Sequence, residues 1–192
     1  MTGGRAIVLL AAALLAGCGS SPKTHYYTLD PVSGLGNGKL AIATPVTVAA
    51  VHLPASLDRR EMIRQTGQNA VDISEQDRWE APLGGLTRRV LTQDLAAYLP
   101  EDMVILPDSP APPRTAQIVV SITQFAPDAA GEVTLGGSWA LLEGGSGKLI
   151  MSRAVRFESP ATARDASSQA SAMSALLGRL AEQIAGGLQK AK

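Results

Sequence analysis

Few residues in this chain could take part in catalysis or metal binding. Two histidines and one cysteine occur in 192 residues, and His25 and His52 stand 27 positions apart. We expect these two histidines to lie in different strands, whereas metal sites usually take three or four ligands from clustered positions. His25 and His52 are therefore predicted to be ordinary, partly exposed strand residues, and no bound metal or other cofactor is expected.

Motifs for nucleophilic catalysis or phosphate binding are missing as well. There is no Gly-x-Ser-x-Gly motif, and Gly145-Ser146-Gly147 is typical of a glycine-rich hairpin turn. A phosphate loop ending at Gly147-Lys148 would need glycine and a hydroxyl residue where Leu142 and Leu149 stand. Acidic residues alternate with arginines between positions 58 and 80, which favours solvated charge pairs over a buried acid–base pair. We therefore predict no catalytic residue and expect that the protein is not an enzyme.

The only cysteine, Cys18, closes a short apolar run that begins after Arg5. A basic start, an apolar run at residues 6–16 and small residues before a cut site are typical of a secretory signal peptide. The run is too short to span a bilayer, which takes about 20 apolar residues. A plain signal peptide that happens to carry a cysteine would look similar.

Leu15-Ala16-Gly17-Cys18 resembles the lipobox of bacterial lipoproteins. That resemblance implies removal of residues 1–17, a diacylglycerol on the Cys18 sulfur and an acyl chain on its new amino group. Gly19, rather than aspartate, follows the cysteine, and in Gram-negative bacteria this favours the outer membrane over retention at the inner membrane. The lipid would be the only non-protein group on the chain.

Charge and length limit the partners of the mature chain. Removing 17 of the 192 residues leaves 175, a suitable size for one domain, with 17 acidic residues against 16 basic ones once Arg5 is lost. A formal charge near −1 argues against nucleic acid as a partner, because nucleic acids require a basic face. The seven residues from Gly19 to His25 would span about 25 Å at most, so the domain is expected to sit close to its membrane.

Periodicity then predicts the elements of the fold. Apolar residues return every three to five positions in two segments, which indicates helices over about 82–99 and 165–190. We expect Arg88, Arg89, Gln93 and Asp94 on the polar face of the first helix, and Gly186-Gly187 to fray the last turn of the second. Alternating or β-branched segments predict the strands, and these lie at about 26–29, 46–52, 61–64, 70–73, 103–106, 116–125, 132–142 and 148–158.

These elements predict a single α+β domain. Its core would be a mixed, mostly antiparallel sheet of five to seven strands with two amphipathic helices packed on it. The expected organisation is a signal peptide at 1–17, a lipidated tether at 18–25 and one domain at 26–192. Arg78 and Trp79, just before the first helix, are candidates for partner binding, because exposed Trp and Arg are favoured at interfaces; the alternative is that Trp79 anchors helix to sheet.

The chain resembles the ABC-type transport auxiliary lipoproteins, including the paraquat-inducible (PqiC/YmbA-like) group. The matching segments are the lipobox, Tyr26-Tyr27-Thr28-Leu29, Val51-His52-Leu53-Pro54, Leu57-Asp58-Arg59, Arg78-Trp79-Glu80-Ala81-Pro82-Leu83 and the strand from Gly131 to Trp139. The resemblance implies a non-enzymatic, outer-membrane lipoprotein subunit of an MCE-type lipid transport system, facing the periplasm. Such subunits form homo-oligomeric rings, dock the MCE-domain protein and support envelope integrity.

The sequence is compatible with two other functions. A periplasmic lipid-binding carrier would use Ala- and Gly-rich strand faces to line an apolar pocket. An envelope hydrolase would need a Ser/His/Asp cluster brought together by the fold.

Overall fold

The computed structural model describes residues 22–32, 39–161 and 164–190. The proposed signal peptide and Cys18 lie outside these residues. The described residues form eight strands and two helices, in this order: β1 (His25–Tyr27), β2 (Val46–His52), β3 (Glu61–Gly67), β4 (Ala70–Trp79), α2 (Leu83–Tyr98), β5 (Val104–Ile105), β6 (Ala116–Pro127), β7 (Glu132–Leu142), β8 (Leu149–Pro160) and α3 (Ala166–Lys190).

A five-stranded sheet, in the order β5-β2-β6-β7-β8, forms one layer of the molecule. Strands β6, β7 and β8 are a long antiparallel meander, whereas β2 runs parallel to both β5 and β6. The expected mostly antiparallel sheet is therefore confirmed, with parallel pairs on its β2 side. Alternation along β6 buries Ile118, Val120 and Ile122, and a bulge after Ile122 shifts the pattern so that Phe125 is buried too.

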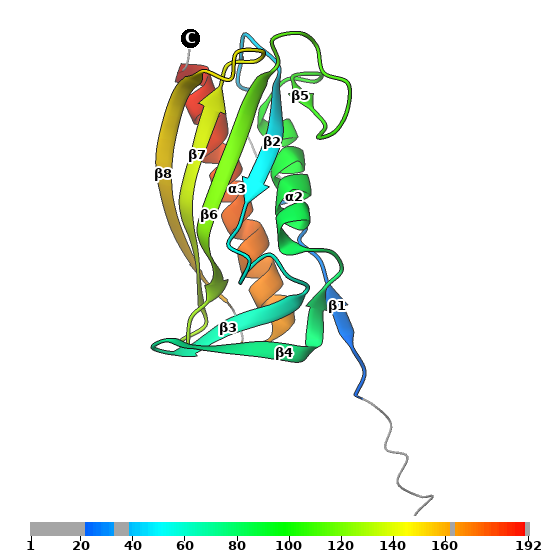
Figure 1. The fold of residues 1–192 in the computed structure, drawn as a ribbon, viewed down its shortest axis with the longest axis vertical. Coiled ribbons are helices and arrows are strands. Elements are labelled where there is room, and N and C mark those ends of the chain that lie inside the picture. Colours follow the sequence, from blue (N-terminus) through cyan, green and yellow to red (C-terminus); the bar gives the residue numbers. More distant parts are fainter. Residues whose placement is uncertain (1–21, 33–38, 162–163, 191–192) are drawn as a thin grey trace, which may run out of the picture.

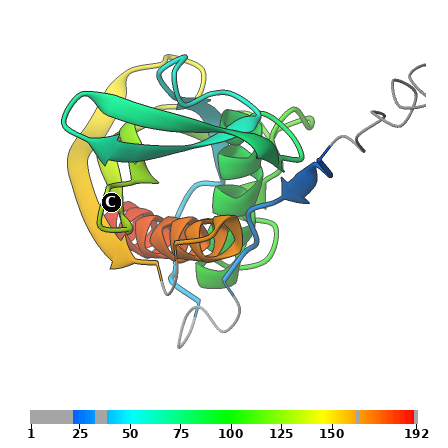
Figure 2. The same ribbon diagram turned by 90° about the horizontal axis from the view of Figure 1, so that it is seen from below.

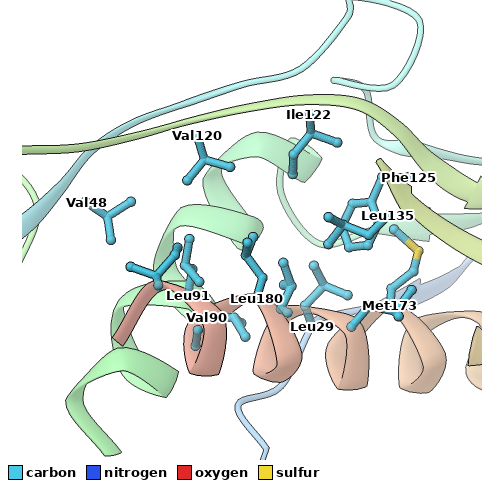
Figure 3. Packing of buried hydrophobic residues seen from close by; sticks show 14 of the residues in the cluster. Leu29, Val48, Val90, Leu91, Val120, Ile122, Phe125, Leu135, Met173 and Leu180 are labelled. Carbon is cyan, nitrogen blue, oxygen red and sulfur yellow. The ribbon is translucent and has the colours of Figure 1, made fainter. Parts of the chain in front are cut away.

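Both helices pack on the same face of this sheet, as Figures 1 and 2 show. Helix α2 contacts β2 and β5, while α3 contacts β6, β7 and β8, and the helices also pack on each other. The core between the layers is filled by buried apolar side chains, many of them at most 2% exposed. Figure 3 shows this packing, with Val48, Val120 and Ile122 from the sheet facing Val90, Leu91, Met173 and Leu180 from the helices.

A second sheet of three strands, in the order β1-β4-β3, lies across one end of the molecule (Figures 1 and 2). The predicted hairpin is present, but β4 extends to Trp79 and pairs in parallel with β1. This small sheet was not predicted as a separate unit. Its third strand is contributed by a segment about 50 residues away in sequence, which local patterns cannot reveal.

Two expectations about the helices are wrong. Asp94 is 1% exposed rather than on a polar face, because it stands four residues from both Val90 and Tyr98 and so shares their buried stripe. Helix α3 also continues through Gly186 and Gly187 to Lys190. Gly187 is buried against Trp139 in the core, so tertiary packing overrides the low helix propensity of glycine.

Candidate functional site

The chain enters the described fold at the end that carries the three-stranded sheet (Figure 1). Pro22 is the first described residue, and β1 begins at His25. Because β1 is hydrogen-bonded to β4, any force on the N-terminal segment is transmitted directly to this sheet. Residues 18–21 of the proposed tether lie outside the described part of the chain.

The segment after β1, residues 28–32, which we call the strap, is fastened to both helices. The Val32 amide donates a hydrogen bond to Asp94 Oδ1 of α2 at 2.9 Å, and the Asp30 amide donates to Ser174 Oγ of α3 at 3.1 Å. Leu29, just before Asp30, is completely buried. The strap therefore couples the entering chain to the helical layer.

A polar cluster fastens the other side of the strap. Arg89 Nη2 donates to Thr28 Oγ1 and to the Leu29 carbonyl, both at 2.9 Å. The Thr28 hydroxyl in turn donates to Glu80 Oε1 at 2.6 Å, and Arg89 lies 3.5 Å from the same carboxylate. Thr28, Glu80 and Arg89 thus join β1, the end of β4 and α2. Because Thr28 is far from Glu80 and Arg89 in sequence, this cluster could not be predicted from the sequence.

Arg78 and Trp79, the two candidate interaction residues, lie on opposite faces of β4. Trp79 is 2% exposed and packs in the core, beside Tyr27 of β1. Arg78 is opposite Tyr26 and is half-buried. Only Arg78 is therefore placed where a partner could reach its side chain.

Asp58 stabilises the start of α2. Pro82 precedes the helix and gives it no side-chain cap, so the first amide groups need another acceptor. Asp58 Oδ1 accepts a hydrogen bond from the Gly84 amide at 2.9 Å, which places a carboxylate at the positive end of the helix dipole. The neighbouring Arg59 pairs with Glu61 at 3.0 Å. The Leu57-Asp58-Arg59 motif therefore positions the loop between β2 and β3 against α2.

Asp94 is the one strongly perturbed acid among the described residues. Burial raises its pKa from 3.8 to about 6, although the hydrogen bond from the Val32 amide acts in the opposite direction. Its second oxygen, Oδ2, is buried without a hydrogen-bond partner among the described residues. This arrangement suits a carboxyl group that is partly protonated at mildly acidic pH.

A Ser/His/Asp cluster lies at the junction of β1 and β4, but its geometry is not that of a nucleophile and base. Asp77 stands between the other two residues: Ser74 Oγ donates to Asp77 Oδ2 at 3.1 Å, and His25 Nδ1 lies 3.4 Å from Asp77 Oδ1. A catalytic serine needs the imidazole, not the carboxylate, as its immediate neighbour. Ser74 also accepts the Asp77 amide hydrogen, so the contact is a local turn.

A hollow of about 660 Å³ lies at the opposite end of the molecule from β1. Its wall combines apolar residues such as Ile42 and Leu188 with the charged side chains of Arg114 and Glu143. Within the described ranges, no group of three His, Cys, Asp or Glu residues could hold a metal ion. No helix in those ranges combines the length and apolar character that crossing a bilayer requires.

Two crystal structures with the same fold are among the solved structures that resemble this chain. An uncharacterized protein aligns with a TM-score of 0.70 at 20% identity, covering 86% of this chain and 99% of that one. Protein XCC0632 from Xanthomonas campestris, of the DUF330 family, aligns with a TM-score of 0.67 at 13% identity, covering 87% and 96%. At these identities the likeness concerns the fold alone.

Comparison at the sequence level gives one match. The family model described as ABC-type transport auxiliary lipoprotein component covers residues 27–185. That range includes the strap, the Asp58 loop, both helices up to Ala185 and every strand except part of β1. A comparison with curated proteins gives no match.

Proposed function

This chain belongs to the ABC-type transport auxiliary lipoprotein component family, and we propose that it is the outer-membrane-anchored, periplasmic subunit of an MCE-type lipid transporter. In this proposal the acylated Cys18 holds the domain on the membrane, and the domain docks an MCE-domain protein and supports envelope integrity. The observation that carries the proposal is the family match over nearly all of the folded chain.

The way the chain enters the fold supports this role. A docking subunit has to hold its partner at a fixed distance from the bilayer, so a load on the anchor should not unravel the domain. Here β1 pairs with β4, and the strap is fastened to α2 and α3 by the Asp94, Ser174 and Arg89 contacts. The short tether would allow at most about 25 Å between the membrane surface and the start of β1.

We further propose that the subunit assembles with copies of itself. Strand β8 is a 12-residue edge of the five-stranded sheet, and no described strand pairs with its outer side. Edge strands of this length offer free amide and carbonyl groups to another chain. A ring of such subunits would present several identical docking surfaces to one partner.

The structure gives less support to the two alternative functions, a lipid-binding carrier and an envelope hydrolase. A lipid carrier was expected to line a pocket with Ala- and Gly-rich strand faces; the small residues Gly136 and Ala140 of β7 face away from the helices and line no described hollow. The hollow at the end opposite β1 is lined in part by the charged side chains of Arg114 and Glu143. An acyl chain bound there would remove these charges from water, which is unfavourable. A hydrolase would need the Ser74–Asp77–His25 cluster in a different order.

Recovery of a partner from the envelope tests the proposal. The full-length lipoprotein, tagged at its C-terminus and solubilised in mild detergent at low salt, is expected to retain an MCE-domain protein, identified by mass spectrometry. An unrelated outer-membrane lipoprotein with the same tag is the control. Recovery of no MCE-domain protein, or equal recovery with the control, would contradict the docking role.

A further inference from the structure

The outer face of the three-stranded sheet begins at β1. Tyr26 pairs with Arg78, and Arg78 pairs with Glu61, so these three side chains project from the same side of the sheet. The next residues along β1 and β4, Tyr27 and Trp79, project from the other side, where Trp79 is buried in the core. The side that carries Tyr26 therefore faces away from the domain.

The pleat of β3 extends this outer face along the hairpin. Glu61, Ile63 and Gln65 alternate with the buried Met62, so the pleat places them on the side of Tyr26; Ile63 is only partly exposed and also packs against the core. Ile63 pairs with Ile73, and Gln65 pairs with Val71. Val71 and Ile73 consequently lie on the same outer face as Tyr26, although a bulge separates them from Arg78 on β4.

This face gathers apolar side chains in solvent. Tyr26 is 63% exposed, Val71 60% and Ile73 41%. They make up three of the six large apolar side chains that are exposed on the described residues; the others are Leu106, Leu149 and Ile150. Single exposed apolar residues are ordinary, whereas several on one sheet face indicate a contact surface.

The position of the tether indicates what covers this face. Seven residues separate Cys18 from Tyr26, so an acylated Cys18 keeps the bilayer within about 30 Å of that side chain. Figures 1 and 2 place the small sheet across the end of the molecule where the chain enters. Tyrosine favours the boundary between lipid and water, and aliphatic side chains gain free energy by leaving water.

We propose that the outer face of the β1-β4-β3 sheet, centred on Tyr26, Val71 and Ile73, rests on the lipid surface to which Cys18 is attached. This inference depends on the lipid anchor of the proposed function. The charged side chains that the register places on this face, Arg78 and Glu61, are of opposite sign. The contact is therefore apolar in character and persists at high salt.

Site-directed spin labels test this contact on the complete lipoprotein. The mature protein is reconstituted in phosphatidylethanolamine/phosphatidylglycerol vesicles, with a nitroxide on Val71→Cys or Ile73→Cys. Leu149→Cys and Ile150→Cys are matched controls, because Leu149 and Ile150 are 56% and 48% exposed. They begin β8, whose 12 residues span roughly 40 Å, at the far end of the sheet.

Collision with oxygen, which enters lipid, is compared with collision with a water-soluble nickel chelate. At positions 71 and 73 we expect the oxygen-to-nickel ratio to be several-fold higher than at 149 and 150, at low and high salt alike. Equal ratios at all four positions would overturn the proposal, as would a difference that disappears in high salt.

The same samples separate failure of this contact from failure of the lipid anchor. Cys18 is the only cysteine of the chain, so its acylation leaves the unsubstituted protein without a free thiol. Labelling of that protein, together with its loss from the vesicles, would refute the anchor itself. An unlabelled, vesicle-bound wild type with water-exposed labels at 71 and 73 would refute only the second contact.

Discussion

At the residue scale, Asp94 joins the strap to the helical layer at an energetic cost. Its Oδ1 accepts the Val32 amide hydrogen, but the carboxyl group is 1% exposed and Oδ2 has no partner among the described residues. Burial penalises the charged form, which is why the pKa rises to about 6. The fold therefore favours a protonated Asp94 that the unfolded chain would not retain above pH 4.

The sign of the pH dependence follows from that shift. A carboxyl group whose folded pKa exceeds its unfolded value contributes most stability at low pH, and this contribution is lost as pH rises through the folded pKa. For Asp94 the loss runs from about pH 4 to above pH 6. It amounts to about 3 kcal/mol at neutral pH, at 1.36 kcal/mol per pKa unit.

Asp94→Asn should therefore change stability in a pH-dependent way. The asparagine oxygen can still accept the Val32 hydrogen bond, but the variant has no charge to bury. We expect it to unfold at nearly the wild-type urea concentration at pH 4.5. At pH 8 it should be about 1–3 kcal/mol more stable than the wild type. The same stability difference at both pH values would contradict a buried, ionising Asp94.

Sequence analysis could locate some residues but not their surroundings. Cys18 stands out because its motif is contiguous, whereas the neighbours Arg78 and Trp79 could not be assigned to different faces. Their faces depend on pairing with β1, which is distant in sequence. The four-residue spacing of Asp94 from Val90 and Tyr98 indicated burial. It was nevertheless expected on the polar face, because aspartate is charged and is usually exposed. The Val32 amide that binds it could not be predicted.

At the element scale, the strongly periodic segments were predicted best. Strand β2 has the expected bounds, and α2 and α3 begin and end within one residue of the expected positions. The apolar residues Leu176, Leu180 and Ile184 are all buried, in agreement with the periodicity that predicts α3. Prediction failed where the partner of an element is distant, as for the parallel pairs β1–β4 and β2–β6.

Two adjacent glycines near the end of α3 provide a matched test of its packing. A Cβ on Gly187 would lie 2.6 Å from Cη2 of Trp139, whereas one on Gly186 would have no described atom within 4 Å. Gly187→Ala should displace the indole and destabilise the protein by about 1–3 kcal/mol. Gly186→Ala should stabilise it by roughly 0.5–1 kcal/mol through helix propensity.

Thermal unfolding of the two glycine variants, followed by circular dichroism, measures both effects under the same conditions. Opposite shifts in melting temperature would agree with a helix whose last turns are fixed by contact with Trp139. Equal shifts in the same direction would contradict that close approach. Such a result would instead support the prediction from the sequence that the last turn of this helix frays at Gly186-Gly187.

At the scale of the whole molecule, the chain has two distinct ends. The three-stranded sheet and the entering chain lie at one end, and the start of β8 lies at the other (Figure 1). The hollow lined by Ile42, Arg114, Glu143 and Leu188 is at this second end. If the first end is held on the membrane, the second faces the periplasm and is free to meet a partner. The length of the domain along β8, roughly 40 Å, would then set the distance between bilayer and partner.

Acylation of Cys18 is the premise on which both the docking role and the lipid contact depend. The most direct measurement is metabolic labelling with a palmitate analogue in a Gram-negative host, with fractionation of the wild type beside Cys18→Ser. We predict a labelled wild-type protein in the outer-membrane fraction, and a Cys18→Ser protein that is unlabelled and still carries residues 1–17. Absence of label from the wild type, or unchanged label and membrane location in Cys18→Ser, would contradict the account.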